Sequence, residues 1–149
     1  MSKRYSIEID DGKVEVDVYD QRKKKLGVLR IDPNDFNIFD RLEKAEGIIN
    51  NAMKRVDNLI KQNAKNKVLA AAIKKADEEI KHQLDIIFDY KVSQTVFKNT
   101  NCLSTHRGVT MIEEFIERIF PILLEVTETE QKVVQSHIDK HTAKYAKRQ

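Results

Sequence analysis

The fold is decided by residues 31–60, IDPNDFNIFDRLEKAEGIINNAMKRVDNLI, where a helix-start signal leads into a long apolar stripe. Asp32 is a typical N-cap, Pro33 suits the first helical position, and Asp35 is an acid near the positive end of the helix dipole. Apolar residues then recur at spacings of three and four over roughly seven turns of a helix. They are Phe36, Phe39, Leu42, Ala45, Ile49, Ala52, Met53, Val56, Leu59 and Ile60. The stretch predicts a long amphipathic helix that begins at Pro33.

Two further helices are predicted downstream. A second apolar stripe runs from Val68 to Phe88, after a polar turn at residues 63–66, and two helices with so short a connection pack as an antiparallel pair. Residues 89–109 lose this periodicity, apart from a single turn through Phe97. Thr110 and Glu113 then form a capping box at the start of the last helix. Pro121 lies inside this helix and predicts a kink or a break.

The N-terminal residues alternate between apolar and polar. Tyr5, Ile7 and Ile9 alternate with polar side chains, and the same is true of the valines in residues 14–18. The intervening Asp10-Asp11-Gly12 provides the positive φ that a tight hairpin turn needs. We expect a β-hairpin here, or a three-stranded sheet if residues 26–31 contribute a third strand. A lone hairpin is marginal in water, so its apolar face should rest on the helices.

These elements define the expected architecture. A chain of 149 residues suits a single domain, and only 4 Gly and 2 Pro favour long, uninterrupted elements. We expect an α+β fold, predominantly helical, with the hairpin or sheet packed on three long helices, the last kinked at its proline. Residues 1–31 would form the sheet region, residues 32–127 the helical core, and residues 128–149 a polar, basic helical tail.

The sequence contains no pattern typical of a catalytic, cofactor or metal site. The four glycines are scattered, so there is no phosphate-binding loop. His137 and His141 would share a helix face, but no third ligand is near in sequence and Ile138 stands where a metalloprotease has its general base. Cys102 and His106 lie in a polar loop without a third group to orient them. We therefore expect no enzyme, no cofactor and no metal.

Composition favours the cytoplasm. The single cysteine cannot form an internal disulfide, which is typical of a reducing compartment. Residues 1–4 lead directly into the alternating segment without an apolar signal core, and no stretch approaches the roughly 20 apolar residues of a membrane span. The net charge of +3 gives little reason to expect nucleic acid, although basic residues gather at 22–25 and at the C-terminal end.

Several segments together resemble the tail assembly chaperones of long-tailed phages and prophages of Gram-positive bacteria. The similarity covers nearly the whole chain and begins with the N-terminal β-hairpin. The segments that carry it are Ile31–Phe36, Arg41–Ala45, Gln83–Phe88, Ser93–Phe97, the group Phe115, Ile119, Pro121 and Ile122, and a basic end with Lys144 and Tyr145. One departure is the stretch Asp89-Tyr90-Lys91, where the family often has glycines.

The resemblance implies a function. Such chaperones act in the cytoplasm of the infected cell, coat the long tape measure protein while tail tube subunits polymerise around it, and are absent from the finished virion. It therefore implies the tape measure as partner, with the major tail protein as a second candidate.

Physical chemistry is compatible with that function. A long helical partner with exposed apolar stripes aggregates unless it is covered, and amphipathic helices can cover it by packing a helix into a groove. The pair Ile48-Ile49 makes the first stripe wider than one neighbouring helix requires. We hypothesise a partner-binding surface or a self-association seam, so that the chain would form a homo-oligomer. Its candidate residues are Phe36, Phe39, Ile48, Ile49, Met53, Phe115, Ile119 and Ile122. The alternative is that these side chains are ordinary core.

Two other functions remain open. A small nucleic-acid-associated regulator would use Arg22–Lys25 and the basic C-terminal stretch, and its DNA binding would be salt-dependent. A structural tail completion protein would be found in purified virus particles.

Overall fold

The protein is predominantly helical, with an antiparallel hairpin near its N-terminus, as expected from the sequence. The computed structural model describes residues 2–88 and 91–146, and for residues 141–146 it gives the path of the helix without the side chains. Asp89 and Tyr90, where the chain departs from the chaperone pattern, lie outside the described residues. The basic end beyond residue 140 is likewise outside the described side chains.

The hairpin lies one segment later than predicted. Strand β1 (Val14–Tyr19) pairs antiparallel with β2 (Lys25–Ile31), with Val14 opposite Ile31 and Val16 opposite Leu29. The basic residues 22–24 therefore form the hairpin connection and do not link it to a third strand. The sheet of β1 and β2 has two strands, so the three-stranded alternative is wrong.

Residues 2–13 form no strand, although the turn conformation predicted at Gly12 is present. Gly12 has a φ of 70°, and its amide donates to Asp10 Oδ1 at 2.8 Å. The β1 valines instead share their apolar face with Leu29 and Ile31, which are 0% and 1% exposed. Pairing with β2 connects β1 to the helical core, whereas Tyr5, Ile7 and Ile9 have no core behind them. Burial of β2 thus decides which hairpin forms.

The first long helix begins later than predicted. Helix α1 (Asn37–Lys61) follows a non-helical turn, in which the Asn34 amide donates to Asp32 Oδ1 at 3.0 Å. Asp32 therefore caps this turn and does not cap α1, so its assignment as the helix N-cap was wrong. Asp and Asn side chains often accept hydrogen bonds from backbone amides two residues on, in turns as well as at helix starts. The pair Asp32-Pro33 is therefore as typical of a turn as it is of the first residues of a helix.

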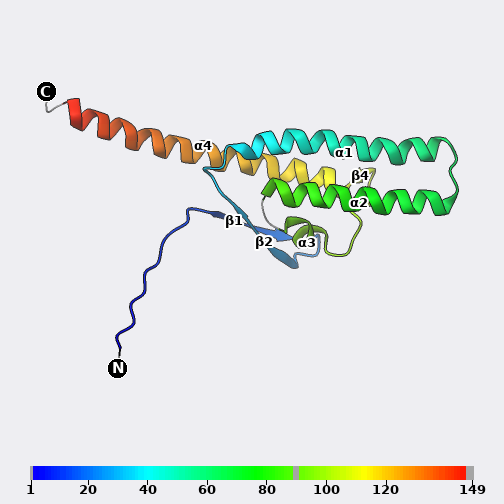
Figure 1. The fold of residues 1–149 in the computed structure, drawn as a ribbon, viewed down its shortest axis with the longest axis horizontal. Helices are drawn as coiled ribbons and strands as arrows, with labels where there is room; N and C mark the ends of the chain where they lie inside the picture. The colour runs from blue at the N-terminus through cyan, green and yellow to red at the C-terminus, as the bar shows by residue number, and fades with distance from the viewer. Residues whose placement is uncertain (1, 89–90, 147–149) are drawn as a thin grey trace.

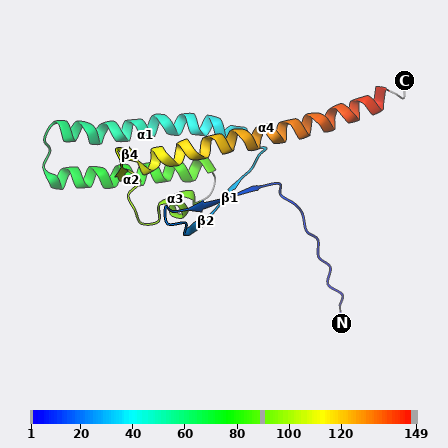
Figure 2. The same ribbon diagram turned by 180° about the vertical axis from the view of Figure 1, so that it is seen from behind.

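The antiparallel pair of long helices is confirmed. Helix α2 (Asn66–Phe88) returns alongside α1 after a short connection in which Asn63 has a φ of 55°. Figures 1 and 2 show the two helices side by side along their length. Arg55 of α1 and Glu79 of α2 form an ion pair across them.

Short elements connect this pair to the last helix. Helix α3 (Val92–Phe97) is tied to α2 because the Ser93 amide donates to Asp85 Oδ1 at 2.9 Å. Strands β3 (Thr105–His106) and β4 (Val109–Thr110) form a small hairpin. Thr110 Oγ1 then accepts from the Glu113 amide at 3.2 Å, which is one half of the predicted capping box. The Glu113 carboxylate accepts from Thr110 Oγ1 at 3.0 Å and not from a backbone amide, so the other half differs from the prediction.

Helix α4 (Met111–Ala146) is the longest element and continues through Pro121 as one helix. The predicted break at the proline is therefore absent. Its first half lies on the α1–α2 pair, and its second half projects from the body of the molecule (Figure 1).

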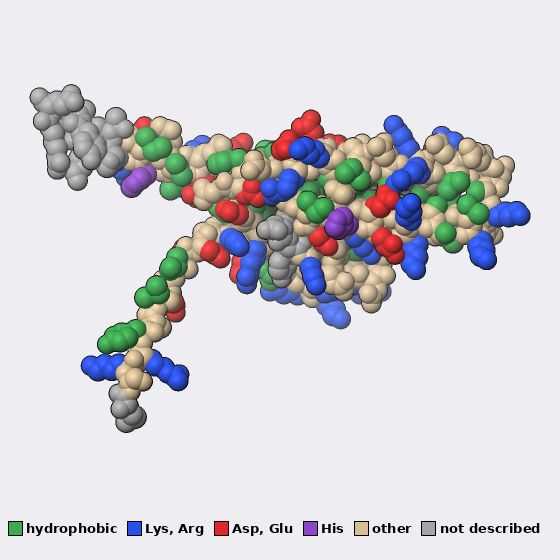
Figure 3. Space-filling model, in the orientation of Figure 1, with side chains coloured by type: hydrophobic (Ala, Val, Ile, Leu, Met, Phe, Trp, Pro, Cys, Tyr) green, Lys and Arg blue, Asp and Glu red, His purple; other side chains and the backbone are tan. Residues whose placement is uncertain are grey.

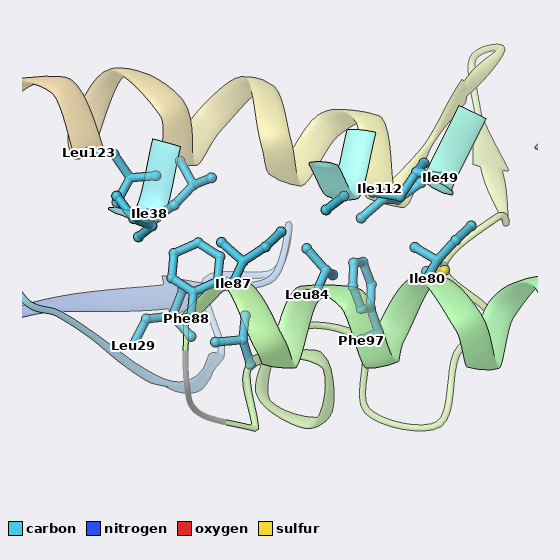
Figure 4. Packing of buried hydrophobic residues seen from close by; sticks show 14 of the residues in the cluster. Leu29, Ile38, Ile49, Ile80, Leu84, Ile87, Phe88, Phe97, Ile112 and Leu123 are labelled. Carbon is cyan, nitrogen blue, oxygen red and sulfur yellow. The ribbon is translucent and has the colours of Figure 1, made fainter. Parts of the chain in front are cut away.

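A single core joins the β1–β2 hairpin to the four helices. Phe97 of α3 and Phe88 of α2 pack edge-on against Phe115 of α4, with ring centroids 6.2 and 6.1 Å apart. In Figure 4 Phe97 and Leu84 lie below Ile112, while Leu29 approaches Phe88 from the hairpin. The predicted turn through Phe97 is confirmed as α3, and Phe97 itself is buried in this core at 2% exposed.

Candidate functional site

An open apolar groove of about 720 Å³ lies between α1 and the first half of α4. The backbones of α1 and α4 approach each other less closely than those of α1 and α2. The floor is made by Ala45, Ile49, Ile87 and Ile112, all of which are buried. In Figure 4 Ile49 of α1 and Ile112 of α4 lie close together.

Larger, partly exposed side chains form the walls of the groove. They are Phe39, Leu42 and Met53 on α1 and Ile116, Phe120 and Pro121 on α4. Phe39 and Phe120 meet edge to face, with ring centroids 6.3 Å apart. Residues three and four apart share a helix face, so each helix presents one continuous apolar row to the groove.

Four glutamates rim this apolar surface. Glu43 and Glu46 lie on α1, and Glu113 and Glu117 lie on α4. Among the described residues, none of the four forms an ion pair, although Glu113 accepts a hydrogen bond from Thr110 Oγ1 at 3.0 Å. An apolar groove between two acidic edges suits a segment whose apolar row is flanked by lysine or arginine.

Three of the predicted surface residues line this groove: Phe39, Ile49 and Met53. Three others from the same prediction lie outside its lining. Ile119 is in the core, at 3% exposed, and Phe115 contacts Phe88 and Phe97. Ile122 is partly buried against the core cluster.

Phe36 and Ile48 are exposed elsewhere. Phe36 lies before α1, is 50% exposed, and contributes to a shallow surface hollow with Val134 and neighbouring polar residues of α4. Ile48 is 39% exposed, and because it comes directly before Ile49 it points away from the groove that Ile49 lines. The predicted set is therefore divided among the groove, the core and two other surfaces.

Phe120 is the main groove residue that the sequence reasoning missed. It is 42% exposed and stands directly before Pro121. Its spacing of four from Ile116 was a usable signal, since the two residues share a face of α4. The predicted surface instead took Phe115, Ile119 and Ile122 from α4, of which Ile119 is buried and the other two are partly buried against the core.

Cys102 is a buried structural residue. Its amide donates to Asp77 Oδ1 at 2.7 Å, and its side chain is fully covered. Burial raises the pKa of the Cys102 thiol to about 12, and the nearby Asp77 carboxylate adds to this effect. The thiolate that a nucleophile requires is therefore strongly disfavoured near neutral pH.

Outside the groove, the described side chains include potential metal ligands and the basic cluster of the hairpin connection. No group of three or more potential ligands in residues 2–88 and 91–140 is placed to hold a metal ion. Arg22 to Lys24 are exposed in the hairpin connection, where Asp20 Oδ1 accepts from the amides of Arg22 and Lys24 at 2.8 and 3.0 Å. Within the described ranges, no helix has the length and apolarity needed to cross a membrane.

Comparison with known proteins identifies no family for this chain. No family model, curated protein or solved structure matches the chain.

Proposed function

We propose that this protein is a phage tail assembly chaperone and that its α1–α4 groove holds an amphipathic helix of the tape measure protein. The observation that carries the proposal is the acid-rimmed apolar groove. The resemblance of segments such as Ile31–Phe36 and Ser93–Phe97 to this chaperone family names the partner. Its place of action would be the host cytoplasm, and the major tail protein is a second partner under the same proposal.

The dimensions of the groove suit a helix. Its α1 wall extends from Phe39 to Met53, which at 1.5 Å per residue is roughly 21 Å, or about four helical turns. A partner helix of that length presents three or four apolar anchors, spaced by three and four residues. Covering such a stripe keeps a long helical chain soluble until it is packaged.

The acidic rims make the fit selective. A helix with lysine or arginine beside its apolar row would place these cations near Glu43, Glu46 and Glu117, whereas an acidic helix would be repelled. Because such rim contacts are exposed to solvent, binding should weaken as salt is added.

The test is co-expression with the tape measure protein of the phage or prophage that encodes this chain. The soluble fraction of the tape measure should rise when the wild-type chaperone is present. Met53→Glu and Phe120→Glu each place a charge in the wall of the groove and should remove most of that gain. Ile48→Asp is the matched control, because Ile48 is exposed on α1 but lies outside the groove.

The possible results distinguish an error in the proposed partner from an error in the proposed binding site. A tape measure that is equally insoluble with and without the wild-type chain would overturn the chaperone function. Soluble complexes formed equally well by the Met53→Glu and Phe120→Glu variants would overturn the groove. Circular dichroism of each variant alone should show unchanged helix content, since both side chains are partly exposed.

A further inference from the structure

The N-terminal arm, residues 2–13, exposes more apolar side chain than any comparable segment described in the structure. Tyr5, Ile7 and Ile9 are 88%, 84% and 82% exposed. Figure 3 shows hydrophobic side chains along the arm, clear of the body of the molecule. Large apolar side chains that lie together on a surface mark a site of contact with another chain.

The pattern of the arm specifies how it would bind. Its apolar side chains alternate strictly with Ser6, Glu8 and Asp10, which is the period of a β-strand with one buried face. A helix groove such as that between α1 and α4 does not match this period. The arm should therefore bind by adding a strand to the edge of a sheet.

A matching edge exists on the molecule itself. Strand β1 pairs with β2 on one side, and in the described part of the chain its other edge has no neighbouring strand. Val14, Val16 and Val18 are only half-buried on the face that meets the core. A strand placed along this edge would cover these valines and satisfy the open backbone groups of β1.

The conformation of residues 10–13 directs the arm away from its own β1. The amides of Gly12 and Lys13 donate to Asp10 Oδ1 and Asp11 Oδ1, at 2.8 and 3.0 Å, in two successive side-chain turns. In Figures 1 and 2 the chain bends before β1 and the arm extends away from the hairpin. The open edge of β1 is then accessible to the arm of another molecule.

We propose that two copies of this chain exchange their N-terminal arms, each arm adding antiparallel to the outer edge of β1 in the other copy. In the register that pairs Ile7 with Val14 and Tyr5 with Val16, the apolar side chains of arm and strand share one face. On the opposite face this register places Glu8 beside Lys13. It also places Arg4 beside Asp17, so both outer pairs are of opposite charge.

The exchange is symmetric, so it produces a closed dimer. The arm exchange uses a surface separate from the α1–α4 groove. It does not depend on the proposed chaperone function. A groove variant such as Met53→Glu should therefore dimerise as the wild type does.

Interchain cross-linking tests the exchange directly. Ser6 of one copy is opposite Glu15 of the other in the proposed register, and both side chains are exposed. A Ser6→Cys chain is mixed with a Glu15→Cys chain and oxidised with a glutathione buffer. A disulfide-linked heterodimer is the expected product, while a Ser6→Cys chain mixed with a Glu46→Cys chain should give none. Cys102 does not interfere, because it is buried.

Sedimentation velocity measures the energetic contribution of the arm. Ile7→Asp should raise the dimer dissociation constant about tenfold or more, since each dimer loses two buried isoleucines. Ile60→Asp is the control, because Ile60 is 53% exposed near the far end of α1 and should leave dimerisation unchanged.

Three results would overturn the exchange. The first is a wild-type chain that remains monomeric at tens of micromolar. The second is a Ser6→Cys/Glu15→Cys double variant that forms its disulfide only within a monomer, which would mean that the arm closes on its own β1. The third is a dimer that Ile7→Asp does not weaken.

Discussion

At the scale of single residues, Cys102 shows how burial determines chemistry. The thiol belongs to the core, its backbone is tied to Asp77 of α2, and its pKa is raised to about 12 from 9.0. Its sequence neighbour His106 is exposed on β3. Cys102 and His106 are close in sequence because they belong to one loop, which is hydrogen-bonded to α2. They are not arranged as a nucleophile and its base.

The raised pKa predicts how stability depends on pH. Between about pH 9 and 12 the Cys102 thiol ionises in the unfolded chain but keeps its proton in the folded chain. The unfolded state then binds fewer protons, so the free energy of unfolding should fall as pH rises above about 9, and the contribution should be fully present below that pH. Urea unfolding of the wild type and of Cys102→Ala between pH 8 and 10.5 measures this effect.

The variant removes the thiol while lysine and tyrosine ionisation remain the same in both proteins. The wild type should be the more stable at pH 8, and its advantage should shrink steadily toward pH 10.5. If the stability of the two proteins changed in parallel with pH, Cys102 would have to titrate alike in the folded and the unfolded chain, which would contradict the prediction.

At the scale of elements, the contact between β2 and α3 depends on a glycine. A Cβ added to Gly27 would lie 2.5 Å from Cγ2 of Thr95, far inside van der Waals contact. Thr95 cannot turn away easily, because β-branched side chains are stiff at χ1. The close approach of the hairpin to α3 therefore requires a residue without a side chain at position 27.

Gly27→Ala should lower the free energy of unfolding by about 1–3 kcal/mol, the usual cost of overpacking. The double variant Gly27→Ala/Thr95→Ser removes the clashing methyl group and should recover most of the loss, whereas Thr95→Ser alone should be nearly neutral. Chemical denaturation of the three variants measures the coupling. Purely additive effects would mean that Gly27 is required for some reason other than contact with Thr95.

The sequence predicted elements well where one local pattern determined them. The apolar stripes gave α1 and α2, and Thr110 with Glu113 gave the start of α4, because these signals lie within a few residues of what they specify. The hairpin failed for a non-local reason. Both the segment at residues 5–9 and β2 are suitable partners for β1 by pattern, and only the core behind Leu29 and Ile31 favours β2.

The groove was only partly predictable for a related reason. Phe39, Ile49 and Met53 were identified from the width of the α1 stripe, which is visible in the sequence. Which face of α4 meets α1 depends on how the two helices pack together, and periodicity within α4 cannot show that. Phe120 was therefore missed, while Ile119 was assigned to a surface although it packs in the core.

At the scale of the whole molecule, the body and the projecting half of α4 have different roles in stability. The core ends near Thr127, which is 3% exposed and donates to the Leu123 carbonyl at 2.8 Å. Residues 131–140 are all exposed, including Val133 at 59% and Ile138 at 49%. The folded body should therefore not require the far part of this helix.

A pair of truncations tests where the body ends. A chain that stops at Ser136 keeps the surface hollow between Phe36 and α4, so its melting temperature should stay within about 2 °C of the wild type. A chain that stops at Glu130 uncovers one side of Phe36 and should melt a few degrees lower, since a loss of 1 kcal/mol corresponds to about 4 °C at this size. Thermal unfolding followed by circular dichroism compares the three chains. If the chain ending at Ser136 melted ten degrees lower, the projecting helix would have to be packed against another part of the protein, or against a second copy, because residues 137–140, the last whose side chains the structure describes, are all exposed.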